Sequence, residues 1–225
     1  MGNFEEASQK YKAGERSEEI TKEILKFYKE KEGQYVFDDD INHNYIRIRA
    51  EWALKQMNEF RFNTGNHDPS VLDLGSWTGA IPNYYFENGF KNLTCLEICD
   101  EACKMASNIY PHLTYVNKSV EEFDPATTYD IILGFELLEH VTSPVEFIKK
   151  YKDLLNPSGV LLLTLPTPDK VFSNPNDHEH INKITEEELS KDGFDVDTLT
   201  IYDKPVEDYN VYHQMTWLAG TFYNK

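Results

Sequence analysis

The stretch Val71-Leu-Asp-Leu-Gly-Ser-Trp-Thr-Gly79 determines the fold that we expect for the whole chain. A short apolar run, interrupted only by Asp73, is typical of a buried strand, and Gly75 and Gly79 bracket the tight turn that follows it. Glycine is needed where a backbone turns sharply or approaches a ligand closely. Residues 80–88 then look helical. A strand, a glycine turn and a helix N-terminus together form a nucleotide-sized site at the carboxyl edge of a parallel sheet.

Glu97 ends the next expected strand, residues 93–98, about twenty residues after the glycine turn. An acid at this spacing is placed to accept hydrogen bonds from both hydroxyls of a ribose. The plainer interpretation is a surface acid at the end of a strand. Because its neighbours in Thr-Cys-Leu-Glu-Ile-Cys are mostly apolar, we favour the ribose role.

The rest of the chain alternates between expected strands and helices, which is typical of an α/β fold. The N-terminal residues 1–32 and 44–60 look helical, and a capping box at Thr185–Glu188 predicts another helix. Further strands are expected at residues 113–116, 129–135, 160–165, 195–202 and 211–222, with helices near 101–110 and from Ser143-Pro144 onward.

Composition limits the partners more than the fold. The net charge is −17, with 22 Lys and Arg against 39 Asp and Glu, so we expect neither nucleic-acid binding nor attachment to an anionic membrane. No apolar run approaches the roughly 20 residues of a membrane helix, and the N-terminus lacks the apolar core of a signal peptide. We therefore expect a cytoplasmic protein, in which Cys95, Cys99 and Cys103 are buried thiols and not a metal site.

Two motifs carry a resemblance to a known family. Gly75-Ser-Trp-Thr-Gly79, preceded by Asp73, resembles motif I of class I S-adenosylmethionine (SAM) methyltransferases, although Trp77 stands where that motif has its middle glycine. Tyr-Asp-Ile-Ile-Leu-Gly-Phe-Glu-Leu-Leu-Glu-His-Val, residues 129–141, resembles motif IV of the ubiquinone-pathway-like O-methyltransferase group of types 11, 12 and 23. The resemblance covers about residues 70–203. The G-x-G-x-x-G turn of NAD-dependent oxidoreductases, which share this fold, is absent.

The resemblance implies an α/β, Rossmann-like class I methyltransferase fold with a seven-stranded, mostly parallel sheet. It implies one structural unit, in which residues 1–62 form an N-terminal helical cap and residues 63–225 form the SAM-binding domain. His43, Tyr45 and Arg47 of the cap are candidates for touching substrate. The cofactor-binding residues that the resemblance implies are Asp73, Gly75, Trp77, Gly79, Glu97, Ser119, Val120, Phe135 and Glu136.

The spacing E-x-x-E-H raises the possibility of a divalent-metal site. It predicts Glu136, Glu139 and His140 on one face of a helical turn, where carboxylates and an imidazole suit Mg²⁺, Mn²⁺ or Zn²⁺. Relatives complete such a set with a later histidine, for which His178 and His180 are both candidates. The alternatives are a metal-free site, in which Glu139 and His140 are catalytic with His140 as the general base, and a purely structural role.

These features predict methyl transfer from SAM to an oxygen of a small molecule or sugar-like metabolite, with or without a divalent metal. No nucleophile is expected, since the methyl group of SAM is already activated. N-methylation, O-methylation of a larger acceptor and a catalytically silent SAM-binding protein are the alternatives. The partner that we expect is a small-molecule acceptor, and a homodimer is left open.

Overall fold

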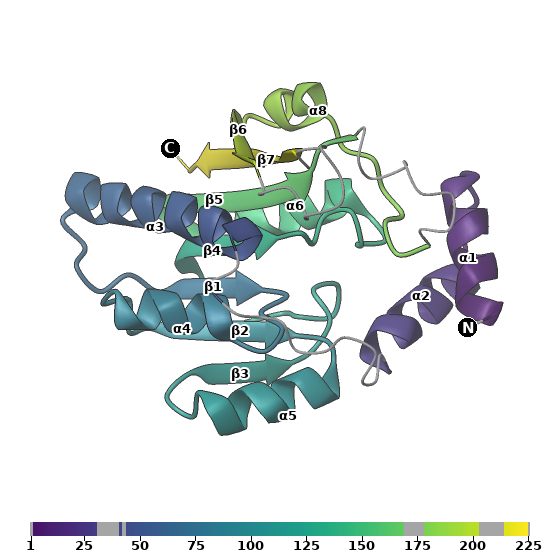
Figure 1. Ribbon diagram of the computed structural model, residues 1–225, viewed down its shortest axis with the longest axis horizontal. Helices are drawn as coiled ribbons and strands as arrows, with labels where there is room; N and C mark the ends of the chain where they lie inside the picture. The colour runs from purple at the N-terminus through teal and green to yellow at the C-terminus, as the bar shows by residue number, and fades with distance from the viewer. Residues whose placement is uncertain (1, 31–40, 42–43, 169–177, 203–213, 225) are drawn as a thin grey trace, which may run out of the picture.

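In the computed structural model, one seven-stranded sheet has the strand order β3-β2-β1-β4-β5-β7-β6 (Figure 1). The structure describes residues 2–30, 41, 44–168, 178–202 and 214–224. The strands are β1 (Val71–Leu74), β2 (Leu93–Glu97), β3 (Thr114–Asn117), β4 (Tyr129–Phe135), β5 (Leu155–Pro166), β6 (Asp195–Tyr202) and β7 (Gln214–Tyr223). The helices are α1 (Gly2–Lys12), α2 (Glu18–Lys29), α3 (Asn44–Thr64), α4 (Ala80–Glu87), α5 (Asp100–Ile109), α6 (Pro144–Asp153) and α8 (Glu186–Lys191).

The strand pairing confirms the expected Rossmann-like fold. Strands β1 to β5 pair in parallel, whereas β7 pairs antiparallel with both β5 and β6. The chain moves outward from β1 through β2 to β3 and then crosses to β4 on the other side of β1. Ligands of such sheets bind in the crevice at this switch point, beyond the carboxyl ends of the strands. The fold therefore places a binding site beyond β1 and β4.

The alternation of side chains along β1 supplies a core to each face of the sheet. Leu72 and Leu74 pack in one apolar cluster with residues of α6 and α8, while Val71 packs in another with residues of α3 and α4. Successive side chains of a strand point to opposite faces, so an apolar run serves both cores. The two layers of helices therefore hold β1 in place, and with it the carboxyl end of the sheet where the site lies.

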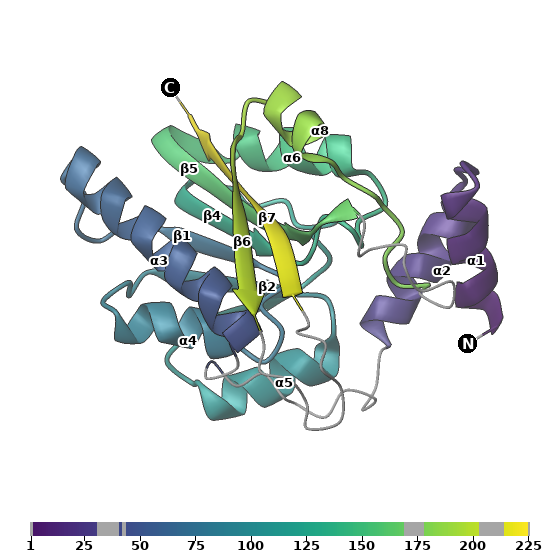
Figure 2. The ribbon, with the colours of Figure 1, turned by 45° about the horizontal axis from the view of Figure 1, so that its top comes forward.

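Helix α3 belongs to the body of the fold. Its residues Ala53, Met57 and Phe60 are buried against the sheet in the cluster that contains Val71. The expected boundary after residue 62 therefore falls inside this helix, which ends at Thr64. The segment that stands apart from the sheet is the pair α1 and α2, which lies beyond the carboxyl ends of β1 and β4 (Figures 1 and 2).

The α1–α2 pair has its own apolar core. Phe4, Tyr11, Ile20 and Ile24 are buried in it together with Ile181, which comes from the segment before α8. The pair is thus attached to the site side of the protein by burial of apolar surface. Within the described residues, no helix combines the length and the apolar character that crossing a bilayer requires.

Most local sequence signals match the structure. Thr185 and Glu188 form the expected capping box, and Pro144 opens α6 after Ser143. The strand expected at residues 160–165 begins earlier, at Leu155, and residues 156–159 form an irregularity in it where pairing with β4 moves from Leu155 to Val160. The expected start of the last strand at residue 211 lies outside the described residues. The three cysteines are free and buried, as expected.

Asp130 ties the start of β4 to its neighbours. Its carboxylate accepts hydrogen bonds from Ser70 N at 2.8 Å, Ser70 Oγ at 2.9 Å, Asn156 Nδ2 at 2.9 Å and Asn66 Nδ2 at 3.2 Å. Burial raises the pKa of Asp130, but the hydrogen bonds from Asn156 and Ser70 outweigh it and hold this pKa below its ordinary value. The ionised form is therefore the one that the fold stabilises.

We predict that this carboxylate makes stability depend on pH in the acid range. Because the folded-state pKa is depressed, the stabilisation is complete above the unfolded pKa of about 3.9 and is lost as pH falls through the folded value. Asp130→Asn should lower the free energy of unfolding at pH 7 by about 1–2 kcal/mol, and the deficit should shrink below about pH 4. Urea unfolding at several pH values measures this. The exposed Asp195→Asn is the control, and a deficit that does not change with pH would contradict the prediction.

Candidate functional site

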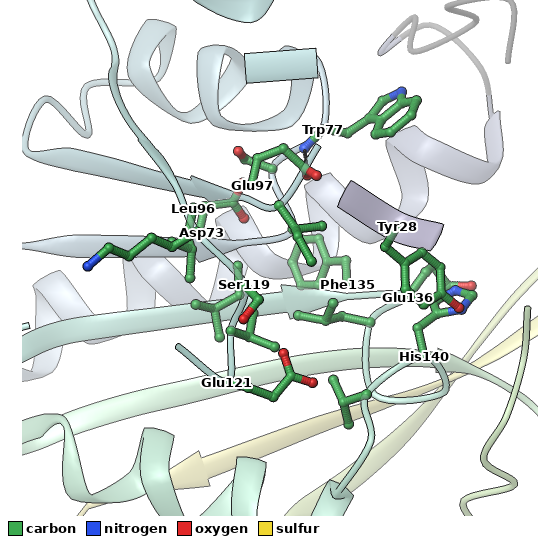
Figure 3. Close-up of a pocket in the computed structure, with 18 of the residues that line it drawn as sticks. Tyr28, Asp73, Trp77, Leu96, Glu97, Ser119, Glu121, Phe135, Glu136 and His140 are labelled. Atoms are coloured by element: carbon green, nitrogen blue, oxygen red, sulfur yellow. Dashed lines mark hydrogen bonds between the residues drawn. The ribbon is translucent and has the colours of Figure 1, made fainter. Parts of the chain in front are cut away.

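A cavity of about 320 Å³ opens at the carboxyl ends of β1, β2 and β4. Eight of the nine expected cofactor residues line it: Asp73, Gly75, Trp77, Glu97, Ser119, Val120, Phe135 and Glu136. The ninth, Gly79, lies outside the lining and caps the N-terminus of α4. Figure 3 shows Glu97 beside the backbone nitrogen of Trp77, and Tyr28 of α2 beside His140.

The turn after β1 adopts the left-handed backbone that its glycines allow. Gly75 has φ +70° and Gly79 has φ +87°. A Cβ on Gly79 would lie 2.5 Å from Tyr115 Oη, and one on Gly75 would touch Leu137 at 3.4 Å. Trp77, with φ +47°, adopts a strained conformation for a non-glycine residue. Its amide hydrogen bond to Glu97 helps to hold the turn in this shape.

Glu97 is held rigidly at the end of β2. It is 5% exposed, and its carboxylate accepts hydrogen bonds from Trp77 N at 2.9 Å and Cys99 N at 2.8 Å. The two amides fix the orientation of this acid at the edge of the cavity, which it lines. This is the arrangement that a pair of ribose hydroxyls needs.

Ser119 and Val120 begin the loop that closes the far side of the cavity. Ser119 is buried, and its hydroxyl accepts a hydrogen bond from Glu122 N at 3.0 Å. Val120 O accepts from Tyr151 Oη at 2.8 Å and from Lys150 Nζ at 3.0 Å. These contacts fix the loop backbone, so this wall of the cavity has a fixed shape.

Glu136 does not share a face with Glu139 and His140, which corrects the one-face geometry expected from E-x-x-E-H. Its φ is +48° where β4 ends, so its side chain leaves the chain in another direction. The carboxylate accepts hydrogen bonds from Trp217 Nε1 at 2.9 Å and Thr164 Oγ1 at 3.2 Å. Glu136 therefore belongs to the wall of the cavity.

Arg49 is a site residue that the sequence interpretation missed. It lines the cavity, is 7% exposed, and places Nη1 3.3 Å from Glu136 Oε1. The sequence did contain a signal for Arg49, because this residue lies on the same stripe of α3 as the buried residues Ala53, Met57 and Phe60. A charged residue in an apolar stripe needs a partner. The cavity thus has a positively charged group at its β4 end.

The expected substrate contacts of the cap are not seen in this cavity. Arg47 is exposed and pairs with Glu51 at 2.6 Å, and Tyr45 uses its carbonyl to accept from Arg49 Nε at 2.9 Å. Neither residue lines the cavity. His43 lies outside the described residues.

Glu139, His140 and His180 come together beside the cavity, and of the three only His140 lines it. One potential ligand atom from each lies within 4.8 Å of the others. Glu139 is 1% exposed, with Oε1 3.8 Å from His140 Nε2, and the two imidazole rings stack with centroids 4.8 Å apart. Of the described residues, only these three form such a group, so Glu136 and His178 are not part of it.

Asn182 brings His180 into this group. Its side chain donates to Val141 O at 2.6 Å and to Leu138 O at 3.2 Å, while the amides of Ile181 and Asn182 donate to Glu139 O at 2.8 and 3.0 Å. These bonds lay residues 180–182 along the loop that carries Glu139 and His140. Two segments forty residues apart thereby form one site.

This chain is similar to known methyltransferases. A family model described as a methyltransferase domain matches residues 16–195. The chain is 24% identical over 149 residues to a ubiquinone biosynthesis O-methyltransferase of Rickettsia akari, covering 64% of this chain and 59% of that protein. It is 23% identical over 142 residues to malonyl-acyl-carrier-protein O-methyltransferase of Halalkalibacterium halodurans, covering 60% and 52%. The chain thus spans about half to three fifths of the length of these curated relatives.

Solved structures share the fold. The plantazolicin methyltransferase BpumL, in complex with a pentazolic desmethylPZN analog and S-adenosylhomocysteine (SAH), has a TM-score of 0.64 at 13% identity, covering 100% of this chain and 98% of its own. N-methyltransferase NodS from Bradyrhizobium japonicum WM9 has a TM-score of 0.58 at 15% identity, covering 82% and 98%. The chain belongs to the methyltransferase-domain family and has the fold of class I SAM-dependent methyltransferases.

Proposed function

We propose that this protein transfers a methyl group from SAM to an oxygen atom of a small-molecule acceptor. The observation that carries the proposal is one continuous cavity. It begins at the glycine turn and Glu97 and ends at His140, which lies next to Glu139 and His180. The named O-methyltransferase relatives support the choice of oxygen over nitrogen.

The residues of the cavity fit the parts of SAM. The left-handed Gly75 leaves room for a ligand close to the backbone, and Glu97 is oriented to accept from the ribose hydroxyls. The guanidinium of Arg49 suits the carboxylate of the methionine part, because its five N–H donors can pair with a ligand carboxylate as well as with Glu136 in the wall. Bound SAM would supply an activated methyl group, so the chain needs only to bind and align the reactants and to take up a proton.

The proton of an acceptor hydroxyl has to leave before or during the transfer. His140 is placed to take it, because its ring lines the cavity. Glu139, His140 and His180 also suit a divalent ion such as Mn²⁺, Mg²⁺ or Zn²⁺, whose charge would lower the pKa of a bound hydroxyl. We favour the metal, because the carboxylate of Glu139 is fully buried beside two imidazoles.

Transfer of tritium from methyl-labelled SAM to a panel of small hydroxylated compounds and amines tests the proposal. We expect label in an extractable O-methyl product, whose identity mass spectrometry establishes. Label only in amines would replace the proposal by N-methylation. A protein that binds SAM but labels nothing would support the silent SAM-binding alternative.

We predict that Glu97→Ala weakens SAM binding by about 1.5–3 kcal/mol, because a charged acceptor of two hydroxyl hydrogen bonds is lost. Calorimetric titration with SAM measures the effect. Glu101→Ala, an exposed acid in the first turn of α5, is the matched control and should bind like the wild type. Unchanged SAM affinity in a folded Glu97→Ala variant would remove Glu97 from the site.

Three further expectations stay predictions. The charge of −17 still argues against nucleic-acid binding near physiological salt, and a gel shift at micromolar protein would overturn this. A cytoplasmic location and a homodimer can be examined by fractionation and by light scattering.

A further inference from the structure

Tyr28 of α2 reaches across from the N-terminal helices to the ring of His140. Its hydroxyl lies 3.0 Å from His140 Nδ1 and donates to Glu179 O at 2.8 Å. His140 Nδ1 also lies 3.0 Å from the same carbonyl oxygen. Three polar atoms from three separate segments therefore meet at one point, on the side of the imidazole that carries Nδ1.

This triangle of contacts determines which nitrogen carries the proton in the neutral ring. A backbone carbonyl only accepts hydrogen bonds, so the contact between Nδ1 and Glu179 O requires a proton on Nδ1. The tyrosine oxygen, whose own proton points to Glu179 O, is then a second acceptor for the same N–H. In the other tautomer the lone pair of Nδ1 would face a carbonyl oxygen, and Tyr28 would have to give up its bond to Glu179.

The opposite nitrogen is the one that the chemistry needs. With the proton on Nδ1, Nε2 carries a lone pair, and it lies on the side of Glu139 at 3.8 Å. A lone pair at Nε2 is required both of a metal ligand and of a base. Histidines in working sites are commonly fixed in this way by a hydrogen bond to the other ring nitrogen.

We infer that Tyr28 is a positioning residue that, with Glu179 O, holds His140 in the Nδ1–H tautomer and points Nε2 into the site. The assignment of a tautomer rests on the contacts alone. Its catalytic consequence rests on the proposed function. The inference also gives the N-terminal helices a specific role, since docking of α2 completes the site around His140.

Tyr11 provides a matched control from the same pair of helices. Its hydroxyl donates to Thr142 O at 2.6 Å and lies 3.3 Å from Asn182 Oδ1, so it attaches α1 to the body of the protein as Tyr28 attaches α2. Tyr11→Phe and Tyr28→Phe each keep the aromatic ring and remove one hydroxyl. Only Tyr28→Phe removes a group that contacts His140.

Nitrogen-15 NMR of chelator-treated, histidine-labelled protein tests the inference. Spectra are recorded about two pH units above the ordinary imidazole pKa of about 6.5, and His140→Gln identifies the signal. We expect the Nδ1–H tautomer in the wild type and in Tyr11→Phe, and a mixture of tautomers in Tyr28→Phe. In the methyl-transfer assay, kcat of Tyr28→Phe should fall about tenfold, with KM for SAM unchanged.

An Nε2–H tautomer in the wild type would overturn the inference, and this spectrum decides even if Tyr28→Phe does not fold. Equal spectra of a folded Tyr28→Phe and Tyr11→Phe would overturn it too, as would equal kcat. Failure of the proposed function looks different. In that case no variant transfers methyl groups, while the spectra still separate Tyr28→Phe from Tyr11→Phe.

Discussion

His140→Ala is expected to lower kcat for methyl transfer by about 10²–10⁴-fold, the usual contribution of a positioned acid–base group. The imidazole lines the cavity, is oriented through Nδ1, and stands beside Glu139 and His180. Whether it holds a metal or takes the proton directly, its removal leaves the acceptor hydroxyl protonated. The loss should therefore appear in kcat under either chemistry.

Binding of SAM should survive the same change. The contacts that we assign to SAM lie at the glycine turn after β1, at Glu97 of β2 and at Arg49 of α3, so its affinity should stay within about threefold, or about 0.7 kcal/mol. Tritium transfer and calorimetry measure the two quantities separately. His112→Ala is the control, because His112 is exposed and bonds Asn83 on α4. A His140→Ala variant with normal kcat would exclude His140 from the chemistry.

The cofactor half of the site could be predicted from the sequence because its signals are local. Gly75 directly follows β1 and Glu97 ends β2, and the parallel pairing of β1 with β2 brings these strand ends together without any detail of side-chain packing. Trp77 shows the limit of such reasoning, since a motif does not say how a bulky residue is accommodated at φ +47°. The answer, an amide hydrogen bond to Glu97, depends on a residue twenty positions away.

The arrangement around His140 could not be predicted, because it depends on contacts between segments that are distant in the sequence. His178 and His180 were equivalent by sequence spacing, and it is the binding of Asn182 to Leu138 and Val141 that brings His180 to His140. Glu136 was expected beside His140 because a helical turn was assumed. The left-handed backbone at the end of β4 turns it toward Trp217 and Arg49 instead.

Removal of metal should abolish turnover, and this prediction separates the two chemistries open to His140. After treatment with EDTA, activity should be lost and should return with Mn²⁺ or Mg²⁺, since the buried Glu139 and the two stacked imidazoles form a group suited to such an ion. Metal content is followed by elemental analysis. If the metal-free enzyme turns over normally, the metal interpretation is wrong, and His140 acts as a general base.

The two histidines of the later segment make this test specific. His180→Ala removes one of three donors and should weaken Mn²⁺ binding by more than about 10²-fold, which exceeds the usual effect of losing an outer partner. His178→Ala removes a side chain outside the group, while its backbone carbonyl still accepts from Ser8 Oγ at 2.5 Å, so it should bind Mn²⁺ like the wild type. Titration of each apo-protein with Mn²⁺ alone measures both affinities. If His178→Ala were the weaker binder, the arrangement of residues 178–182 around a bound ion would have to differ from the one seen here. The ligand group would then be Glu139, His140 and His178.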